Sequence, residues 1–343
     1  MSTPIRLGII GCGWAGQQAV HAAVALPGIE VTAIADLEES LRQATLAAHP
    51  KIPHQHGPYQ DLLHNPAVDA VYLAVNPAMR YPMVLDAIAA GKHLLVQKPH
   101  AVRAEHVLEF ASAADAAGVT LQFCYFMRHF PLNRALRERI RAGAIGEPYH
   151  GRVFLKYNTR PAPEGITRWL QIYGQKGGVL AQHASHEFNL AWSWLGCPEP
   201  AWAHAAKHVV NPVYDGPEGP AEDYLSGLVG FKGGQTLQID CSRWLHADLP
   251  TTVEVFGTEG AISHREITRL TNGSYERETV DADPDFPHSD NMGLYFYHEI
   301  EHFARAISGA VAPEPDAQEA SQFMRVLDGL YDSALAEEKV TIA

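Results

Sequence analysis

The chain reads Ile5-Arg6-Leu7-Gly8-Ile9-Ile10-Gly11-Cys12-Gly13-Trp14-Ala15-Gly16 close to its amino terminus. A short apolar run leads directly into the pattern G-x-G-x-x-G, and a helix-like segment and a second apolar run over residues 30–35 follow. The second run ends in Asp36, 20 residues after Gly16. A strand, a glycine turn, a helix, a strand and an acidic residue in this order are typical of a dinucleotide-binding α/β unit.

Each glycine has a physical reason in such a loop. Gly11 permits a tight turn, Gly13 lets the backbone approach a pyrophosphate, and Gly16 lets the helix pack close to the strand. The first amides of the helix then offer unpaired N–H groups and a partial positive charge to the phosphates. The alternative is a glycine turn that binds no nucleotide. The loop residues that we expect to contact the cofactor are Gly11, Cys12, Gly13, Trp14, Ala15 and Gly16.

Asp36 also predicts which dinucleotide binds. A carboxylate at this position accepts hydrogen bonds from both ribose hydroxyls of NAD and repels the 2′-phosphate of NADP. Residues 37–40 carry no positive charge, and Arg42 is the first basic residue after Asp36. The sequence therefore predicts NAD rather than NADP.

The composition limits the classes of protein to consider. A chain of 343 residues is long enough for two domains with their own cores. Its 39 acidic and 26 basic side chains give a net charge of −13, which argues against a nucleic-acid partner, because phosphate backbones need a basic face. No apolar run reaches the length of about 18 residues that a membrane span needs. Four scattered cysteines and the lack of a secretion signal predict a cytoplasmic protein with no membrane partner.

Strand-like and helix-like segments alternate in the first third of the chain. The strand-like segments are continuously apolar, as in a parallel sheet that is covered on both faces. They cover residues 5–10, 30–35, 70–75, 93–97 and 119–125, with helical segments such as 80–90 and 103–117 between them. This pattern predicts an α/β Rossmann domain over residues 1–125, built on a doubly wound parallel sheet.

The pattern changes from about residue 148. Apolar and polar residues now alternate, as in an antiparallel sheet with one face on the core and one open face. Such segments cover 149–157, 224–232, 235–242 and 251–256, and helices are predicted over 131–142, 184–195, 294–308 and 317–336. We expect an α+β domain over residues 126–343 that binds substrate and forms oligomers, with a C-terminal helix that can pack back on the first domain.

The fourth predicted strand ends in Gln97-Lys98-Pro99-His100. Ligands of parallel α/β sheets bind beyond the carboxyl ends of the strands, so Lys98 is expected near the nicotinamide. An amine there can hydrogen-bond a substrate hydroxyl, and burial can lower its pKa to a useful range. A surface lysine in a turn is the alternative. The further residues expected at the cofactor are Asn76, Pro77, Gln97, Lys98 and Arg128.

A second polar cluster lies within residues 177–189, where a glycine turn precedes an apolar helix. Gln182, Ser185, His186 and Asn189 fall near one helical stripe by three- and four-residue spacing. His186 can accept a hydroxyl proton while a hydride leaves for the nicotinamide, since the ordinary pKa of histidine suits acid–base work. A core histidine is the alternative. The predicted catalytic residues are Lys98, His186 and Gln182.

Aromatic and basic side chains follow the first strand of the second domain. Aromatic faces stack on the C–H surfaces of sugars, and arginine binds hydroxyls or carboxylates. A solvated loop is the alternative interpretation. The side chains concerned are Tyr157, Arg160, Arg168 and Trp169. The full set of predicted substrate-binding residues is Lys98, Tyr125, Tyr157, Arg160, Trp169, His183 and His186.

The ordered motifs resemble one known family, the glucose–fructose oxidoreductase/inositol dehydrogenase/MocA-like (Gfo/Idh/MocA) oxidoreductases. The resemblance covers nearly the whole chain and implies an enzyme that uses NAD or NADP on sugars, cyclitols or their derivatives. By this resemblance, the family lysine of E-K-P corresponds to Lys98, and the family histidine of D-x-G-x-H-x-x-D corresponds to His186. The motifs lie at residues 11–16, 90–93, 97–99, 126–131, 143–146, 177–189, 256–260 and 330–334.

Three carboxylates of the family pattern are amides in this chain. Gln97 replaces the glutamate before the lysine, and Gln182 and Asn189 replace the two aspartates around the histidine. Hydrogen bonding survives, but negative charge near Lys98 is lost, which should lower the pKa of that lysine. We expect these amides, with Arg128, to position groups in the site.

One stretch, His298-Glu299-Ile300-Glu301-His302, also fits the zinc-protease pattern H-E-x-x-H. With 19 histidines in the chain such a match arises readily by chance. The stretch also resembles a structural helix of the family. His183 and His186 are a second pair at helical spacing. We expect no metal at either pair.

The combined features predict an NAD-dependent oxidoreductase that transfers a hydride between the nicotinamide and a sugar, cyclitol or related polyol. Two alternatives stay open. One is an enzyme that oxidises a sugar transiently to cleave or epimerise it while it retains NAD, and the other is a non-catalytic sugar or nucleotide sensor. The open sheet face and the family resemblance predict a homodimer or homotetramer.

Overall fold

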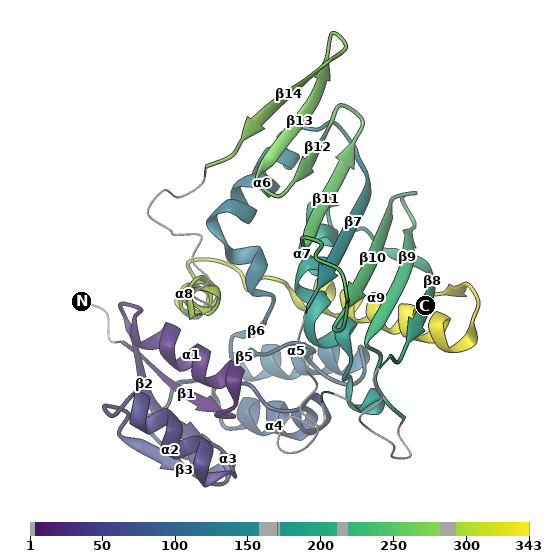
Figure 1. Ribbon diagram of the computed structural model, residues 1–343. Helices are drawn as coiled ribbons and strands as arrows, with labels where there is room; N and C mark the ends of the chain where they lie inside the picture. Colours follow the sequence, from purple (N-terminus) through teal and green to yellow (C-terminus); the bar gives the residue numbers. More distant parts are fainter. Residues whose placement is uncertain (1–3, 158–169, 171, 211–218, 282–292, 343) are drawn as a thin grey trace. The chain divides into compact units, whose positions relative to one another are not determined.

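The structure is a computed structural model that describes residues 4–157, 170, 172–210, 219–281 and 293–342. The chain forms two compact units (Figure 1). The first unit comprises residues 1–126 and 288–321, and the second comprises residues 127–287 and 322–343.

The first unit is built on a six-stranded sheet in the order β3-β2-β1-β4-β5-β6, and every neighbouring pair is parallel. The order reverses between β1 and β4, and ligands of such sheets bind at the carboxyl ends of the strands at this point. The predicted doubly wound sheet is therefore confirmed. Its strands are β1 (Ile5–Ile10), β2 (Ile29–Ala35), β3 (His54–His56), β4 (Ala70–Leu73), β5 (His93–Val96) and β6 (Leu121–Phe123).

The helices of the first unit begin where the parallel strands must cross over. Consecutive residues of the central strands are buried, because helices cover both faces of the sheet. These helices are α1 (Trp14–Val24), α2 (Glu39–Ala48), α3 (Tyr59–Leu63), α4 (Pro77–Ala89), α5 (Glu105–Ala117) and α8 (Gly293–Ile307).

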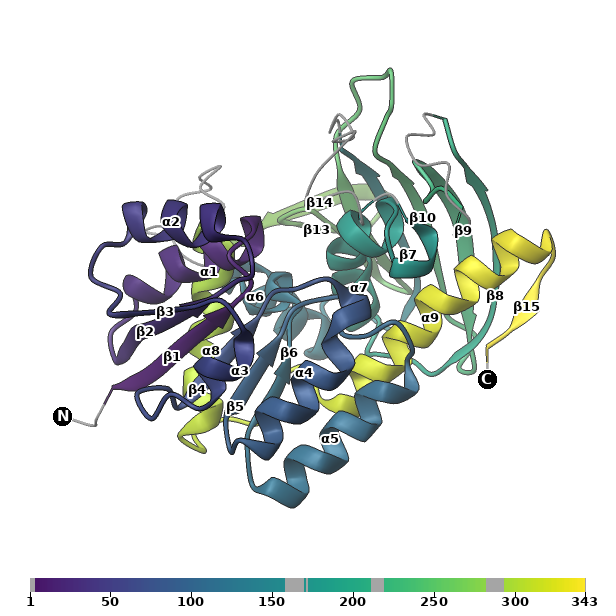
Figure 2. The same cartoon turned by 90° about the horizontal axis from the view of Figure 1, so that it is seen from below.

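Helix α8 comes from a distant part of the sequence but belongs to the first unit. It lies beside α1 (Figures 1 and 2), and Phe296, Ile300 and Phe303 join a core cluster that includes Leu7 and Ile9. The sequence placed this helix within a second domain over residues 126–343. The difference has a physical reason, because the apolar stripe of α8 completes the core of the parallel sheet.

The second unit contains a nine-stranded sheet in the order β14-β13-β12-β11-β7-β10-β9-β8-β15. Among the described strands, β7 and β10 form a parallel pair and the other neighbours are antiparallel. The predicted, mostly antiparallel sheet is confirmed. Its strands are β7 (Pro148–Lys156), β8 (Pro200–His208), β9 (Tyr224–Phe231), β10 (Thr236–Ser242), β11 (Thr252–Gly257), β12 (Gly260–Ser263), β13 (Glu266–Thr271), β14 (Ser274–Thr279) and β15 (Val340–Thr341).

Helices cover one face of this sheet. Helix α7 (Ser185–Trp194) packs on β7, β10 and β11, and α9 (Ala317–Ala336) lies along β8 and β9, where the hydroxyl of Ser333 accepts the Ala205 N–H at 2.9 Å. Helix α6 (Pro131–Arg141) packs against α7. Alternate residues of β10 are buried, as its sequence predicts. In the described part of the chain, every helix is too short or too polar to cross a bilayer.

Candidate active site

The glycine loop of the first unit has the geometry that a phosphate cradle needs. Gly11 has a φ of +95°, and a Cβ at Gly16 would lie 1.8 Å from the carbonyl oxygen of Gly11. A Cβ at Gly13, in contrast, would have open space within 4 Å. The backbone therefore excludes side chains at the first and third glycines, and the middle glycine leaves room for a ligand.

Helix α1 begins directly after this loop, at Trp14, with Gly13 as its N-cap. No side chain of the described residues caps its first amides. Trp14 is 56% exposed and meets the ring of Phe296 edge-on at 5.9 Å. An uncapped helix amino terminus beside open space is a site for an anionic group such as a pyrophosphate.

Asp36 lies at the end of β2, next to the glycine loop. Its carboxylate accepts the Cys12 N–H at 2.7 Å and the Glu38 N–H at 2.9 Å through different oxygens. A carboxylate has about four acceptor positions, so each oxygen keeps capacity for a ribose hydroxyl. The two amides fix the orientation of the carboxylate before a ligand arrives.

Arg42 lies closer to Asp36 than its sequence distance suggests. The first turn of α2 brings its guanidinium to the carbonyl oxygens of Asp36 and Leu37, to which it donates hydrogen bonds. The positive charge near Asp36 is thus engaged with the backbone. Sequence spacing gave no sign of this contact.

The predicted cofactor residues Asn76 and Pro77 form the start of α4. Asn76 is the N-cap and accepts the Ala78 N–H at 3.0 Å, and Pro77 is the first helical residue. Both are typical helix-start residues, so the sequence explains their positions.

Lys98 follows β5 in a buried turn, and the Lys98–Pro99 peptide bond is cis. The side chain of Gln97 donates to the hydroxyl of Tyr72 at 2.7 Å and accepts the Lys98 N–H at 2.7 Å. Both ends of the amide are therefore used, and a carboxylate at this position could not donate to Tyr72.

Arg80 from α4 holds the same turn and was missed by the sequence analysis. It is 2% exposed and donates to the carbonyl oxygens of Gln97, Pro99 and Val75. Burial lowers the pKa of Arg80 to about 9. The available signal was an arginine within an apolar helix, which indicates a specific buried partner.

The predicted substrate residue Tyr125 lies at the end of the same sheet. It is 1% exposed, and its ring packs edge-on against His100 at 5.0 Å. Burial lowers the pKa of His100 to about 3, so this imidazole is neutral at physiological pH. Both rings belong to the packed core of the turn.

In the second unit, the predicted catalytic helix begins with a π-helical turn over Leu180–Ala184, followed by α7. Gln182 and His183 lie in this turn, and His186 and Asn189 lie in α7. Gln182 donates to the carbonyl oxygen of Lys176. The helix predicted over 184–195 corresponds to α7 and is confirmed, but the sequence did not predict the π-turn before it. Such π-turns are frequent at functional sites.

Two predicted substrate residues of the second unit meet in the structure. The rings of Tyr157 and His183 are stacked, with centroids 4.4 Å apart and planes 22° apart. Tyr157 is 37% exposed. The pair offers an aromatic surface of the kind that packs on sugar rings. Arg160, Arg168 and Trp169, which the sequence analysis named beside Tyr157, lie outside the described residues.

Arg128, predicted at the cofactor, lies in the second unit. It is 2% exposed, donates to the side-chain oxygen of Asn189 at 2.6 Å, and lies 5.7 Å from the ring of Trp192. The guanidinium thus holds the polar stripe of α7. An aspartate at position 189 would pair with this arginine as an ion, and the amide forms a hydrogen bond instead.

The zinc-like pattern in α8 directs its groups to different partners. The Nδ1 atom of His298 lies 3.5 Å from the Oε2 atom of Glu301. The Nδ1 atom of His302 lies 3.0 Å from the Oε1 atom of Gln122 on β6. Glu299 is fully buried, and burial raises its pKa to about 8. The buried side chains Phe296, Ile300 and Phe303 of this helix serve the packing of the first unit.

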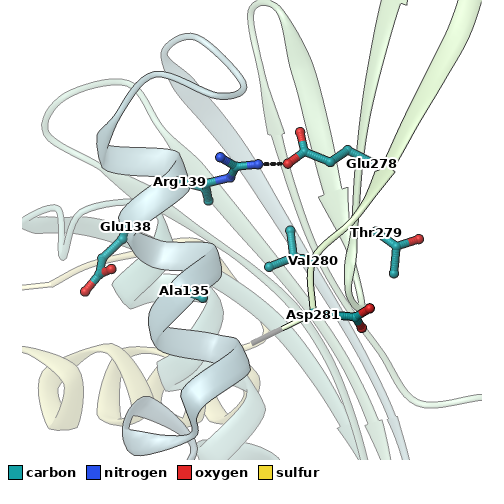
Figure 3. Close-up of a pocket in the computed structure, with 7 residues that line it drawn as sticks. All are labelled: Ala135, Glu138, Arg139, Glu278, Thr279, Val280 and Asp281. Carbon is teal, nitrogen blue, oxygen red and sulfur yellow. Dashed lines mark ion pairs between the residues drawn. The ribbon is translucent and has the colours of Figure 1, made fainter. Parts of the chain in front are cut away.

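Figure 3 shows a cavity of about 460 Å³ in the second unit, between α6 and the end of β14. An ion pair between Arg139 and Glu278 crosses it. Its lining contains none of the predicted site residues. The residues that line it are Ala135, Glu138, Arg139, Glu278, Thr279, Val280 and Asp281.

The chain matches known families and proteins over most of its length. Residues 5–125 match the oxidoreductase family with an NAD-binding Rossmann fold, and residues 133–263 match the GFO/IDH/MocA C-terminal domain. The 1,5-anhydro-D-fructose reductase of Ensifer adhaerens is 30% identical over 317 residues, which are 92% of this chain and 91% of the relative. The chain belongs to the Gfo/Idh/MocA oxidoreductase family.

Other proteins show similarity to this Gfo/Idh/MocA chain over comparable lengths. The D-xylose 1-dehydrogenase (NADP(+)) 2 of Haloferax volcanii is 26% identical over 96% of this chain and 97% of the relative. The structure of levoglucosan dehydrogenase in complex with NADH and levoglucosan has a TM-score of 0.86 over 99% of this chain and 100% of that chain, at 19% identity. The likeness confirms the fold predicted from the sequence motifs.

Proposed function

We propose that this chain is an NAD-dependent oxidoreductase that transfers a hydride between the nicotinamide and a CH–OH carbon of a sugar, cyclitol or related polyol. The observation that carries the proposal is the oriented carboxylate of Asp36 beside the uncapped start of α1. The names of the relatives, a 1,5-anhydro-D-fructose reductase and a D-xylose dehydrogenase, support a carbohydrate substrate.

The preference for NAD follows from charge at the ribose position. Asp36 is oriented by two amides and would repel a 2′-phosphate, while Arg42 already donates to two carbonyl oxygens. The NADP named for the Haloferax volcanii relative makes this choice the first to test. The glycine cradle, the open amides of α1 and Asp36 fit a dinucleotide together.

Lys98 and His186 have different roles in the proposed reaction. When bound, the nicotinamide accepts the hydride from an alcohol carbon or returns it to a carbonyl carbon. Lys98 orients and polarises the substrate oxygen, and His186 accepts its proton in the oxidative direction. Gln182, Asn189 and Arg128 position groups around His186, and the stacked pair of Tyr157 and His183 offers a surface to the sugar.

Turnover with a panel of sugars and polyols tests the proposal. The purified protein and NAD are incubated with each compound. The formation of NADH is followed by absorbance, and the formation of product is followed by chromatography. Net NADH formation with one class of polyol is the expected result. Product without net NADH would instead indicate transient oxidation with retained NAD, and binding without product would indicate a sensor.

A further inference from the structure

A fully buried carboxylate lies beneath the start of the predicted catalytic helix. Glu222, which precedes β9, is 0% exposed. Its Oε1 atom accepts the Leu180 N–H at 3.0 Å and lies 3.1 Å from the hydroxyl of Tyr331. Its Oε2 atom has no hydrogen-bond partner among the described residues. A Cβ at Gly178 would come within 2.0 Å of that oxygen, so the glycine turn is shaped to admit the carboxylate.

Tyr331 of α9 completes this arrangement from the other side. Its hydroxyl accepts the Ala181 N–H at 3.2 Å and lies 3.4 Å from the carbonyl oxygen of Gly177. Glu222 and Tyr331 together therefore satisfy two amides at the start of the π-turn, which would otherwise be buried without acceptors. An anion at this end of a helix is also stabilised by the helix dipole.

The neighbouring turn is fixed to the same helix α9. Lys176 forms an ion pair with Asp328, and its Nζ atom lies 5.7 Å from the ring of Tyr331. The carbonyl oxygen of Lys176 accepts the side-chain amide of Gln182. One buried cluster therefore holds the glycine turn, the π-turn and a predicted catalytic side chain.

We propose that Glu222 is a positioning residue that, with Tyr331, fixes the π-turn and thereby sets the orientation of Gln182 and His186. The inference rests on the roles assigned to those two residues in the proposed function. Glu222 acts through the backbone at Leu180 and through Tyr331, and neither group needs to touch the substrate.

The protonation state of Glu222 should then affect the helix. The titratable and charged groups that act on it are Tyr331 of α9, Arg243 after β10 and Cys241 of β10. Asp240 of β10 and Glu187 of α7 act electrostatically on Cys241. Burial raises the pKa of Glu222 to about 7, against the opposing effects of the Leu180 amide, Tyr331 and Arg243. The ionised carboxylate accepts the two donors more strongly than the protonated one does.

The charge is tested by Glu222→Gln, which keeps an acceptor oxygen and removes the ionisation. We expect this variant to match the wild type in kcat at pH 6 and to fall about tenfold behind at pH 8.5, since charge-assisted hydrogen bonds are roughly twice as strong as neutral ones. KM and NAD affinity should change little. Glu199→Gln removes an exposed carboxylate of the same unit, paired with Lys232, and serves as the matched control.

The hydrogen bonds are tested by Tyr331→Phe, which removes only the hydroxyl. Hydrogen exchange of residues 179–184 should become faster in this variant, because the Ala181 amide loses its acceptor. In the wild type, protection of the same segment should rise between pH 6 and 8.5 after correction for intrinsic exchange, and this rise should be absent in Glu222→Gln.

Two results would overturn the inference. One is a Glu222→Gln variant whose kcat keeps the wild-type pH profile, and the other is unchanged exchange of residues 179–184 in both variants. The exchange measurement needs no substrate. If no sugar is turned over by the wild type, the proposed function fails while the exchange result still decides whether Glu222 and Tyr331 hold the turn.

Discussion

The side-chain amide of Gln97 donates a hydrogen bond to the hydroxyl of Tyr72, and its oxygen accepts the backbone N–H of Lys98. The first bond joins the end of β5 to the middle of β4, directly before the predicted catalytic lysine. A glutamate in this position, as the family pattern has it, would reverse the first hydrogen bond and add negative charge. The substitution thus keeps the turn in place and changes the charge around Lys98.

Lys98→Met should keep NAD affinity and lose turnover. The lysine follows β5 at the carboxyl edge of the sheet, beyond the phosphate cradle, and the loss of one positioned proton-transfer or polarising group typically costs about 10²–10⁴-fold in rate. Steady-state kinetics and an NAD titration measure both effects. Lys51→Met, which alters an exposed lysine, is the control. Turnover close to that of the wild type would remove Lys98 from the mechanism.

Asp36→Ala should weaken the binding of NAD and reduce the ratio of NAD affinity to NADP affinity. The variant loses an oriented acceptor for the ribose hydroxyls, and hydrogen bonds to a charged group contribute about 1.5–3 kcal/mol each. Fluorescence titration with both dinucleotides measures the change, with the exposed Trp14 beside the loop as a local reporter. A wild-type protein that binds NADP more tightly than NAD would contradict the prediction. In that case, Arg42→Ala would show whether the Arg42 guanidinium is the cause of the tighter NADP binding.

His186→Asn should remove one ionisation from the pH profile of kcat in the oxidative direction. Activity rises with pH as the base loses its proton, and the midpoint belongs to the coupled groups of the site rather than to a free histidine. His204→Asn, on an exposed part of β8, is the control. An unchanged profile in His186→Asn would exclude the histidine as the base.

The activity of the wild-type protein should be insensitive to chelators. We expect neither the pair His183 and His186 nor the pair His298 and His302 to bind zinc. Elemental analysis and activity after dialysis against EDTA check this. Stoichiometric zinc, with activity lost to the chelator and restored by metal, would overturn both the proton role of His186 and the hydride-transfer proposal.

Glu299→Gln should stabilise the protein at alkaline pH. Burial raises the pKa of Glu299 to about 8 from an ordinary value of 4.5. The folded state therefore holds this proton where the unfolded state has lost it, so its contribution to stability is complete below about pH 4.5 and is lost as the pH rises to about 8. Thermal unfolding at pH 5 and pH 9 measures the effect, which amounts to about 1.4 kcal/mol for each unit by which the pKa is raised. If the variant and the wild type differed in stability by the same amount at pH 5 and at pH 9, the raised pKa of Glu299 would be contradicted.

The second unit should mediate a homodimer or homotetramer. The sheet face opposite α7 carries the partly buried apolar side chains Phe154, Leu228 and Phe256. An apolar patch on a sheet face often marks an interface with another subunit. Light scattering at micromolar concentration should give a multiple of the 37.6 kDa chain. Phe154→Lys should lower that mass, whereas Tyr275→Lys, at a 74% exposed side chain, should not. A monomeric wild type would contradict the prediction.

Local patterns predicted the parallel sheet and the cofactor loop closely. The apolar runs at 5–10 and 30–35 correspond to β1 and β2, and the conformation of Gly11 is the one that its place in the motif requires. Such features depend on residues close in the sequence, so periodicity and glycine spacing reveal them. The strands β13 and β14 and the alanine-rich β8 were missed because they lack a strong apolar alternation.

The chemistry of the two candidate regions was only partly visible in this way. The sequence identified Gln182, His183 and His186, and it associated Tyr157 with the same function, but it gave no sign of the π-turn. It also gave no sign of Arg80, whose backbone partners lie up to 19 residues away along the chain. Hydrogen bonds to carbonyl oxygens have no side-chain partner in the sequence that could reveal them.

By itself, then, the sequence determined the dinucleotide-binding fold and the family, because each of these has a local signature. The tertiary structure decided which distant groups meet. Glu222 reaches Leu180 from 42 residues away, Tyr331 reaches Ala181 from 150 residues away, and α8 joins the first unit. The physical reason is that buried polar groups must find partners wherever the packed core places them, and that placement depends on the whole chain.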